Sequence, residues 1–158
     1  KEHRWPLLAA SLAAITIGGG LTLLLITQLV LQLGPWYLPR YMVPLAGMVF
    51  ANAMTAVSLA AERLHAELGH GLAWEKARLT AYQAAMIPVI NSLFAVGLVA
   101  LPGMMTGQIL SGVSPLVAVG YQIMVMCMIF AASGISTAIF LALCRQRALA
   151  WQELPEPG

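Results

Sequence analysis

Long uncharged apolar stretches alternate with short charged segments along this chain. No Asp, Glu, Lys or Arg occurs in residues 5–39, 41–61 or 79–144. A helix needs about 20 apolar residues to cross a hydrocarbon core of about 30 Å. The first two stretches therefore have room for one crossing each, and the third for two. Because backbone N–H and C=O groups cannot stay unpaired in lipid, such segments must be helices or the strands of a closed barrel.

The apolar runs predict helices rather than barrel strands. Barrel strands alternate apolar and polar residues over about ten positions, whereas residues 21–30 and 121–140 show no such alternation. We therefore expect an all-α, polytopic membrane helix bundle that forms one transmembrane domain over residues 1–158. The predicted spans are residues 6–33, 41–61, 84–110 and 116–144, with a polar, partly helical connection at 62–83 and a tail at 145–158.

Composition excludes an ordinary soluble domain. Hydrophobic residues make up 60% of the chain and charged residues 9%, with a mean hydropathy of +0.84, whereas soluble domains carry about 25% charged residues. The net charge of +2 is small, and the basic residues flank the predicted spans. No nucleic-acid partner is therefore expected, and membrane lipid is the expected surroundings.

The positions of the basic residues predict the orientation. Seven of them lie at the two ends and in the 62–83 connection: Lys1, Arg4, Arg63, Lys76, Arg78, Arg145 and Arg147. Only Arg40 lies in the first connection, and residues 111–115 carry no charge. Since Lys and Arg favour the cytoplasmic side, we expect both ends and the central connection to be cytoplasmic.

The first residue is Lys, which indicates a trimmed or partial product, and the long apolar stretch after Trp5 does not match a signal peptide. Cys127 and Cys144 are predicted about 25 Å apart on one helix, so they cannot pair within it. Each is expected to act as a small hydrophobic residue.

Glycines suggest two places of close helix packing. Gly18, Gly19 and Gly20 lie near the centre of the first span, where glycine weakens a helix but lets another helix approach. Gly103 and Gly107 form a GxxxG pattern directly after Pro102. We expect Pro102 and Gly103 to break the helix, and Gly103 and Gly107 to pack against another helix.

Polar and sulfur-containing residues inside the spans are the candidates for a transport pathway, because they are costly in lipid and tend to face a bundle interior. The candidate pathway residues are Met48, Asn52, Met54, Asn91, Met104, Met105, Gln108, Tyr121 and Gln122. Two other interpretations stay open: the amides form hydrogen bonds between helices, and the methionines fill gaps in the core. If the thioethers instead meet a passing metal ion, they suit Cu(I) best.

The sequence lacks the residues that several kinds of chemistry require. The spans contain no Asp, Glu, Lys, Arg or His, which disfavours a proton- or sodium-coupled carrier. The chain has no GxxxxGK[ST], HExxH or GxSxG motif, so it is not expected to be an enzyme by itself or to hold a cofactor. His65 and His70 are spaced for different helix faces, and we expect them to be solvated rather than metal ligands. The ligands of any metal site are unknown at this level.

Three segments carry a family resemblance: VPLAGMVFANAM (residues 43–54), IPVINS (87–92) and GLVALPGMMTGQILSGVSPLVAVGYQIMV (97–125). They closely resemble the FetB/YbbM family of ABC-transporter permeases, which includes bacterial iron-export permeases and plant aluminium-tolerance permeases. The resemblance covers residues 10–147 and implies that this chain is the C-terminal part of a longer protein in the bacterial inner membrane. It also implies a separate cytoplasmic ATPase that uses ATP and Mg²⁺, a pair of permeases, and export of iron or another metal ion.

The 62–83 connection is the expected docking surface for that ATPase. Leu64, Leu68 and Leu72 recur every four residues beside Glu67, which gives an apolar stripe. Leu68–Gly69 resembles the coupling motif of the family, although the segment is shorter here. An amphipathic helix lying on the membrane surface is the alternative. For the whole chain, a nucleotide-independent channel or carrier and a membrane scaffold remain the rival functions.

Overall fold

A computed structural model describes residues 4–30, 39–98 and 102–152, and these residues form helices joined by short turns, with no strand among them. The elements are α1 (Arg4–Leu25), the π-helix η1 (Ile26–Val30), α2 (Pro39–Gly69), α3 (Trp74–Leu98), α4 (Gly103–Leu110) and α5 (Pro115–Gln152). Four of the helices are long and apolar enough to cross a membrane: α1 continued by η1, α2, α3 and α5. The predicted all-α membrane bundle is thus confirmed.

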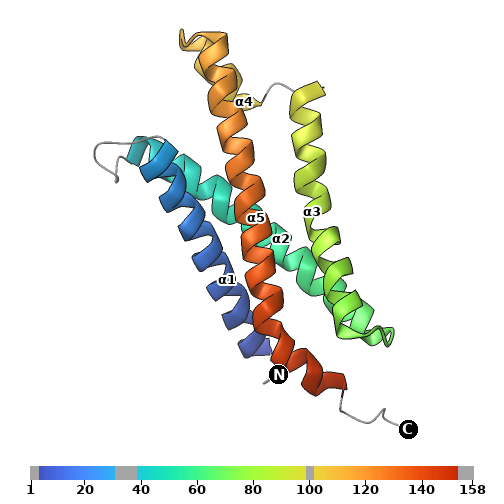
Figure 1. The fold of residues 1–158 in the computed structure, drawn as a ribbon. Coiled ribbons are helices and arrows are strands. Elements are labelled where there is room, and N and C mark those ends of the chain that lie inside the picture. Colours follow the sequence, from blue (N-terminus) through green and yellow to red (C-terminus); the bar gives the residue numbers. More distant parts are fainter. Residues whose placement is uncertain (1–3, 31–38, 99–101, 153–158) are drawn as a thin grey trace.

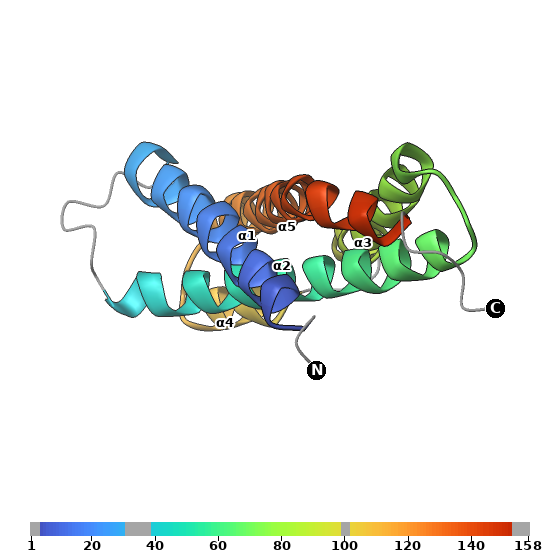
Figure 2. The ribbon, with the colours of Figure 1, turned by 90° about the horizontal axis from the view of Figure 1, so that it is seen from below.

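Helix α5 is the centre of the bundle. It packs against α1, α2, α3 and α4, and Figure 1 shows α1 and α3 on its two sides with α2 crossing the bundle obliquely. Seen along the bundle in Figure 2, α5 again lies between α1 and α3. The start of α1, the α2–α3 turn and the end of α5 lie at the same end of the bundle (Figure 1), as the predicted orientation requires.

Helices α2 and α4 end in the same hydrogen-bonding pattern, which requires a glycine after the helix. After α2, the Leu72 N–H donates to the Glu67 C=O and the Gly71 N–H to the Leu68 C=O. After α4, the Val113 and Gly112 N–H groups donate in the same pattern to Gln108 and Ile109. Gly71 and Gly112 have φ values of +77° and +89°, as this helix-ending motif requires of a glycine. The corners satisfy carbonyls that each helix end would otherwise leave unpaired.

The third predicted span differs from the structure. In place of one segment over residues 84–110, α3 begins at Trp74 and ends at Leu98, and residues 103–110 form the separate helix α4. The polar connection itself is mostly helical, since α2 continues to Gly69 and only His70–Ala73 are outside helices. Pro88 leaves α3 unbroken. The last helix also extends to Gln152, into the predicted tail.

Small residues set the distances between helices. A Cβ atom on Gly18 of α1 would lie 2.8 Å from the backbone nitrogen of Ser136 on α5, and one on Gly19 would lie 2.8 Å from the Phe50 ring of α2. A Cβ on Gly20 would meet nothing within 4 Å. The close packing expected of this glycine run therefore holds at its first two positions, where the helices touch.

Gly18→Ala should destabilise the protein, because the added methyl group collides with α5 backbone that cannot move alone. The cost expected for such overpacking is about 1–3 kcal/mol. Gly20→Ala on the same helix is the matched control and should be neutral or slightly stabilising. Thermal unfolding of both purified variants in detergent checks this. Equal melting temperatures for the two variants would contradict the contact.

Candidate functional site

The candidate pathway residues on α2 and α5 lie at the end of the bundle away from the α2–α3 turn. There a cluster of buried residues joins α1, α2 and α5: Leu23, Leu45, Val49, Val125, Met128 and Ala132. Met48 is half-buried and packs against this cluster, as Met124 does. Gln122 is buried and Tyr121 is half-buried. The structure thus brings Met48 and the polar start of α5 toward the same end of the bundle.

Among the described residues, the hydrogen bond of Asn52 stays within its own helix. Its side-chain Nδ2 donates to the Met48 carbonyl one turn earlier, at 2.8 Å. Thr55 bonds in the same way to Ala51. These bonds satisfy the polar side chains locally, so this half-buried face of α2 remains suited to lining a path.

Helix α4 carries the next group and packs against α5. Met104 is exposed, while Met105 and Gln108 are half-buried. The Gln108 Oε1 atom is buried and accepts no hydrogen bond from the described residues. A buried amide oxygen without a hydrogen bond costs free energy. Gln108 is therefore a pathway candidate that still needs a hydrogen-bond donor from outside the described residues.

Asn91 and Met54 stand apart from these groups. The buried face of α3 ends at Val89, and Asn91 beyond it is exposed. Met54 is 58% exposed on α2. The candidates are therefore spread over four helices, α2, α3, α4 and α5. Their role as a pathway lining stays a prediction.

The two packing glycines of α4 have open space beside them among the described residues. A Cβ atom on Gly103 or on Gly107 would meet nothing within 4 Å. Pro102 does lie where a helix begins, since α4 starts directly after it. The helix packing predicted for Gly103 and Gly107 is thus not made among the described residues, and it remains a prediction for contacts with other segments or subunits.

The predicted docking stripe packs partly inside the chain, with Leu64 buried and Leu68 and Leu72 half-buried. Leu64 is 6% exposed, and Leu68 and Leu72 pack on the same core cluster together with Trp74. Glu67 is also buried and pairs with Arg63 at 2.6 Å. The leucines pack in the contact between α2 and α3, because both helices are apolar on the sides that face each other. Leu68 and Leu72 are half-buried and Gly69 is exposed, and the assignment of this set to ATPase contacts stays a prediction.

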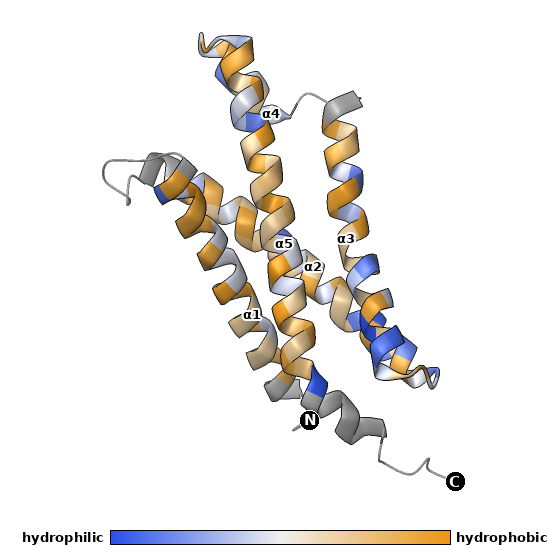
Figure 3. Ribbon diagram, in the orientation of Figure 1, coloured by the Kyte–Doolittle hydropathy of each residue, from blue (hydrophilic) through white to orange (hydrophobic). Residues whose placement is uncertain are grey.

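What the α2–α3 turn exposes is polar. Figure 3 shows hydrophilic residues gathered there and apolar residues along most of the remaining helices. Among the exposed residues around the turn are Glu62, Arg63, His65, Gly69, His70, Glu75, Lys76 and Arg78. Within the part of the chain that the structure describes, no group of three or more His, Cys, Asp or Glu side chains could hold a metal ion.

A buried hydroxyl cluster on α5 was not predicted. Ser133, Ser136 and Thr137 are fully buried, and their hydroxyl groups have no hydrogen-bond partner among the described residues. Their spacing places them on neighbouring positions of one helix side. Small residues four apart, Ser133 and Thr137, were the available sequence signal for close packing.

The chain matches one family model over residues 1–149, described as "Uncharacterised protein family (UPF0014)". This chain belongs to the UPF0014 family. Its relatives include three proteins named UPF0014 membrane proteins and two with functional names. No solved structure matches the chain.

Three relatives show how far the similarity extends. The UPF0014 membrane protein slr1647 of Synechocystis is 39% identical over 84% of this chain and 54% of its own length. The protein named "Probable iron export permease protein FetB" of Escherichia coli is 36% identical over 82% of this chain and 55% of its own. "Protein ALUMINUM SENSITIVE 3" of Arabidopsis thaliana is 34% identical, with shares of 84% and 54%. This UPF0014 chain spans about half the length of the curated relatives it matches.

Leu64→Ala in this UPF0014 protein should lower stability by about 2–5 kcal/mol, because it opens a cavity between α2, α3 and α5. Leu143→Ala, where the side chain is 47% exposed, is the control and should cost much less. Thermal unfolding in detergent measures both. If Leu64→Ala is as stable as the control, Leu64 is not a core residue.

Proposed function

We propose that this chain is part of the membrane-spanning permease of an ATP-driven exporter of iron or another metal ion. The observation that carries the proposal is the 36% identity to the Escherichia coli protein named a probable iron export permease. Four membrane-crossing helices with polar and thioether side chains on them are compatible with that role. The chain itself supplies no nucleotide site, so ATP and Mg²⁺ would be bound by a partner ATPase.

The proposed orientation puts the α2–α3 turn and both ends in the cytoplasm of a bacterial inner membrane. Support comes from the charges at the helix ends that lie together in Figure 1: the end of α2 carries Arg63, the start of α3 carries Lys76 and Arg78, and the end of α5 carries Arg145. Positive residues favour the cytoplasmic side. Two such permeases are proposed to pair with two ATPase subunits.

The ATPase is proposed to dock on the exposed surface of the turn rather than on the leucine stripe. Gly69 and His70 are exposed at the end of α2, and a Cβ atom at Gly69 would meet nothing within 4 Å. A polar surface of this kind suits a partner that binds through a rim of charges and hydrogen bonds.

Gly69→Arg tests the docking surface. The side chain has room within the chain, so thermal stability should remain close to that of the wild type. A long charged side chain in an interface should instead lower the amount of ATPase that co-purifies by about tenfold or more. Retention of the ATPase at wild-type level would move the docking site elsewhere.

The substrate proposal is tested by ATP hydrolysis of the complete permease and its ATPase, reconstituted in lipid and titrated with ferrous iron, Cu(I), zinc and aluminium. We expect one metal to stimulate hydrolysis, and Met104→Ala and Gln108→Ala to reduce that stimulation several-fold. Leu110→Ala is the control, since Leu110 lies on the same helix and is 83% exposed.

Three other outcomes would redirect the proposal. A complex that ignores every metal keeps the ATP-driven transporter and rejects these substrates. Metal flux without any ATPase favours a channel or carrier. Stimulation that survives both pathway substitutions removes Met104 and Gln108 from the path.

A further inference from the structure

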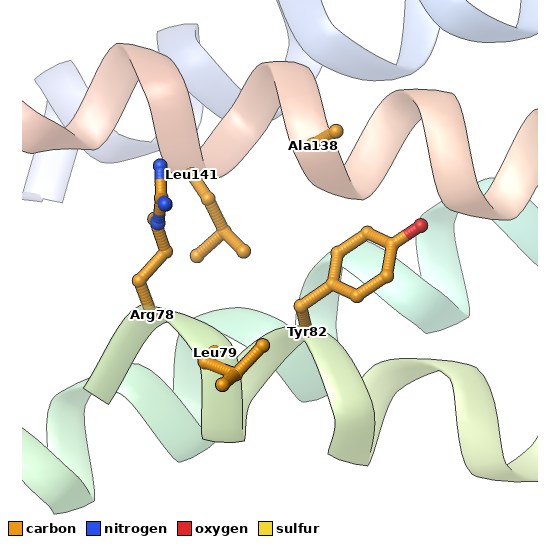
Figure 4. Close-up of a pocket in the computed structure, with 5 residues that line it drawn as sticks. All are labelled: Arg78, Leu79, Tyr82, Ala138 and Leu141. Carbon is orange, nitrogen blue, oxygen red and sulfur yellow. The ribbon is translucent and has the colours of Figure 1, made fainter. Parts of the chain in front are cut away.

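A cleft opens between α3 and α5 beside the α2–α3 turn. Arg78, Leu79 and Tyr82 of α3 line one wall, and Ala138 and Leu141 of α5 line the other (Figure 4). Its volume is about 190 Å³, several times the roughly 30 Å³ that one water molecule occupies in the liquid. None of the candidate pathway residues contributes to it.

The walls of the cleft are mostly apolar, and one aromatic ring spans its inner end. Figure 4 shows the Tyr82 ring directed toward α5. Its hydroxyl oxygen would lie 3.1 Å from a Cβ atom at Gly134, so the missing side chain of Gly134 makes room for it. Leu79 is 58% exposed. An occupant of the inner cleft would therefore meet hydrocarbon and an aromatic ring.

The mouth of the cleft is positively charged. In Figure 4 the Arg78 guanidinium points toward α5 near Leu141. Arg145 is exposed one helical turn beyond Leu141, which puts it on the same side of α5. Among the described residues, Arg78 pairs with Glu75, whose Oε2 lies 3.1 Å from the Arg78 guanidinium. Both partners of that pair are about half exposed or more, and such surface pairs are weak, so Arg78 remains available to an anion.

The depth of the cleft matches the membrane surface. Arg78 directly precedes the uncharged stretch of residues 79–144, and Arg145 directly follows it. Both arginines thus mark the boundary between charged residues and the apolar helices, where lipid phosphates lie. Long basic side chains typically extend to that level.

We propose that this cleft binds an anionic phospholipid, with the lipid phosphate held by Arg78 and Arg145 and the acyl chain lying along Leu79, Tyr82 and Leu141. Basic pockets between membrane helices on the cytoplasmic side suit anionic headgroups, and a guanidinium binds phosphate through paired hydrogen bonds. The apolar wall favours a lipid over a soluble phosphate as the ligand. The site is independent of the transport proposal, since it requires neither ATPase nor metal.

Native mass spectrometry of the protein, produced from its complete gene and held in a mild detergent, tests this site. The probes are phosphatidylglycerol and phosphatidylcholine with identical acyl chains, titrated separately. We expect phosphatidylglycerol to bind more tightly. Arg78→Gln should weaken its binding by about tenfold through loss of charge-assisted hydrogen bonds, while phosphatidylcholine binding changes little.

Lys76→Gln is the matched control. It removes the same charge at nearly the same depth, but two residues along a helix point to opposite sides, and Lys76 is exposed away from the cleft. Its phosphatidylglycerol binding should stay at the wild-type level. Ala138→Leu fills the cleft without changing charge and should weaken binding of both lipids. Melting temperatures close to that of the wild type establish that each variant is folded.

Two results would overturn the proposal. Equal weakening by Arg78→Gln and Lys76→Gln would show attraction to diffuse surface charge instead of a site. Competition by free glycerol phosphate at the concentrations at which phosphatidylglycerol binds would show a soluble-phosphate site, with no part for the apolar wall. Neither result bears on whether the protein transports metal ions.

Discussion

Close approach of helix backbones to α5 is the contact on which the bundle depends. Lipid tails are as apolar as leucine, so membrane helices gain little from hiding apolar surface from one another and associate through packing. Here the packing uses side chains of minimal size. Gly18 lies against Ser136, and the buried face of α3 is formed largely by Ala77, Ala81 and Ala85. Beside the cleft between α3 and α5, the missing side chain of Gly134 leaves room for the Tyr82 ring.

The same packing distinguishes the residues that hold the helices together from those that remain exposed. Leu64, Trp74 and Cys144 belong to one buried cluster beside the turn, whereas Asn91, Met104 and the two glycines of α4 face away from the described helices. Polar and small residues on an exposed face of a membrane helix are costly unless something covers them. The chain spans about half the length of its curated relatives, so family members contain further sequence that can supply such a cover.

The sequence predicted the helices that a bilayer requires, but it missed the features that depend on how those helices pack against one another. The helices follow from stretches without charge, and the Gly18–Gly19 contact follows from the glycine run. The leucine stripe was correctly seen as apolar, but periodicity cannot say whether such a stripe faces a partner or the chain's own next helix. The helix break predicted at Pro102 and Gly103 is found, since α4 begins directly after Pro102. The cleft was missed because its two walls, residues 78–82 and 138–141, are far apart in the sequence, and only the fold places α3 beside α5.

Helix α5 also has a mechanical consequence. Its 38 residues contain proline only at the first position, and at 1.5 Å per residue it is roughly 57 Å long, nearly twice the thickness of the hydrocarbon core. Helices α2 and α3, in contrast, contain Pro44 and Pro88 in their interiors, where the backbone lacks one hydrogen bond and bends more easily. The bundle therefore combines a central helix without an internal proline, α5, with two neighbours that each contain one. We therefore expect a tilt imposed at the end beside the α2–α3 turn to pass along α5 to the corner where α4 joins it, with bending concentrated near Pro44 and Pro88.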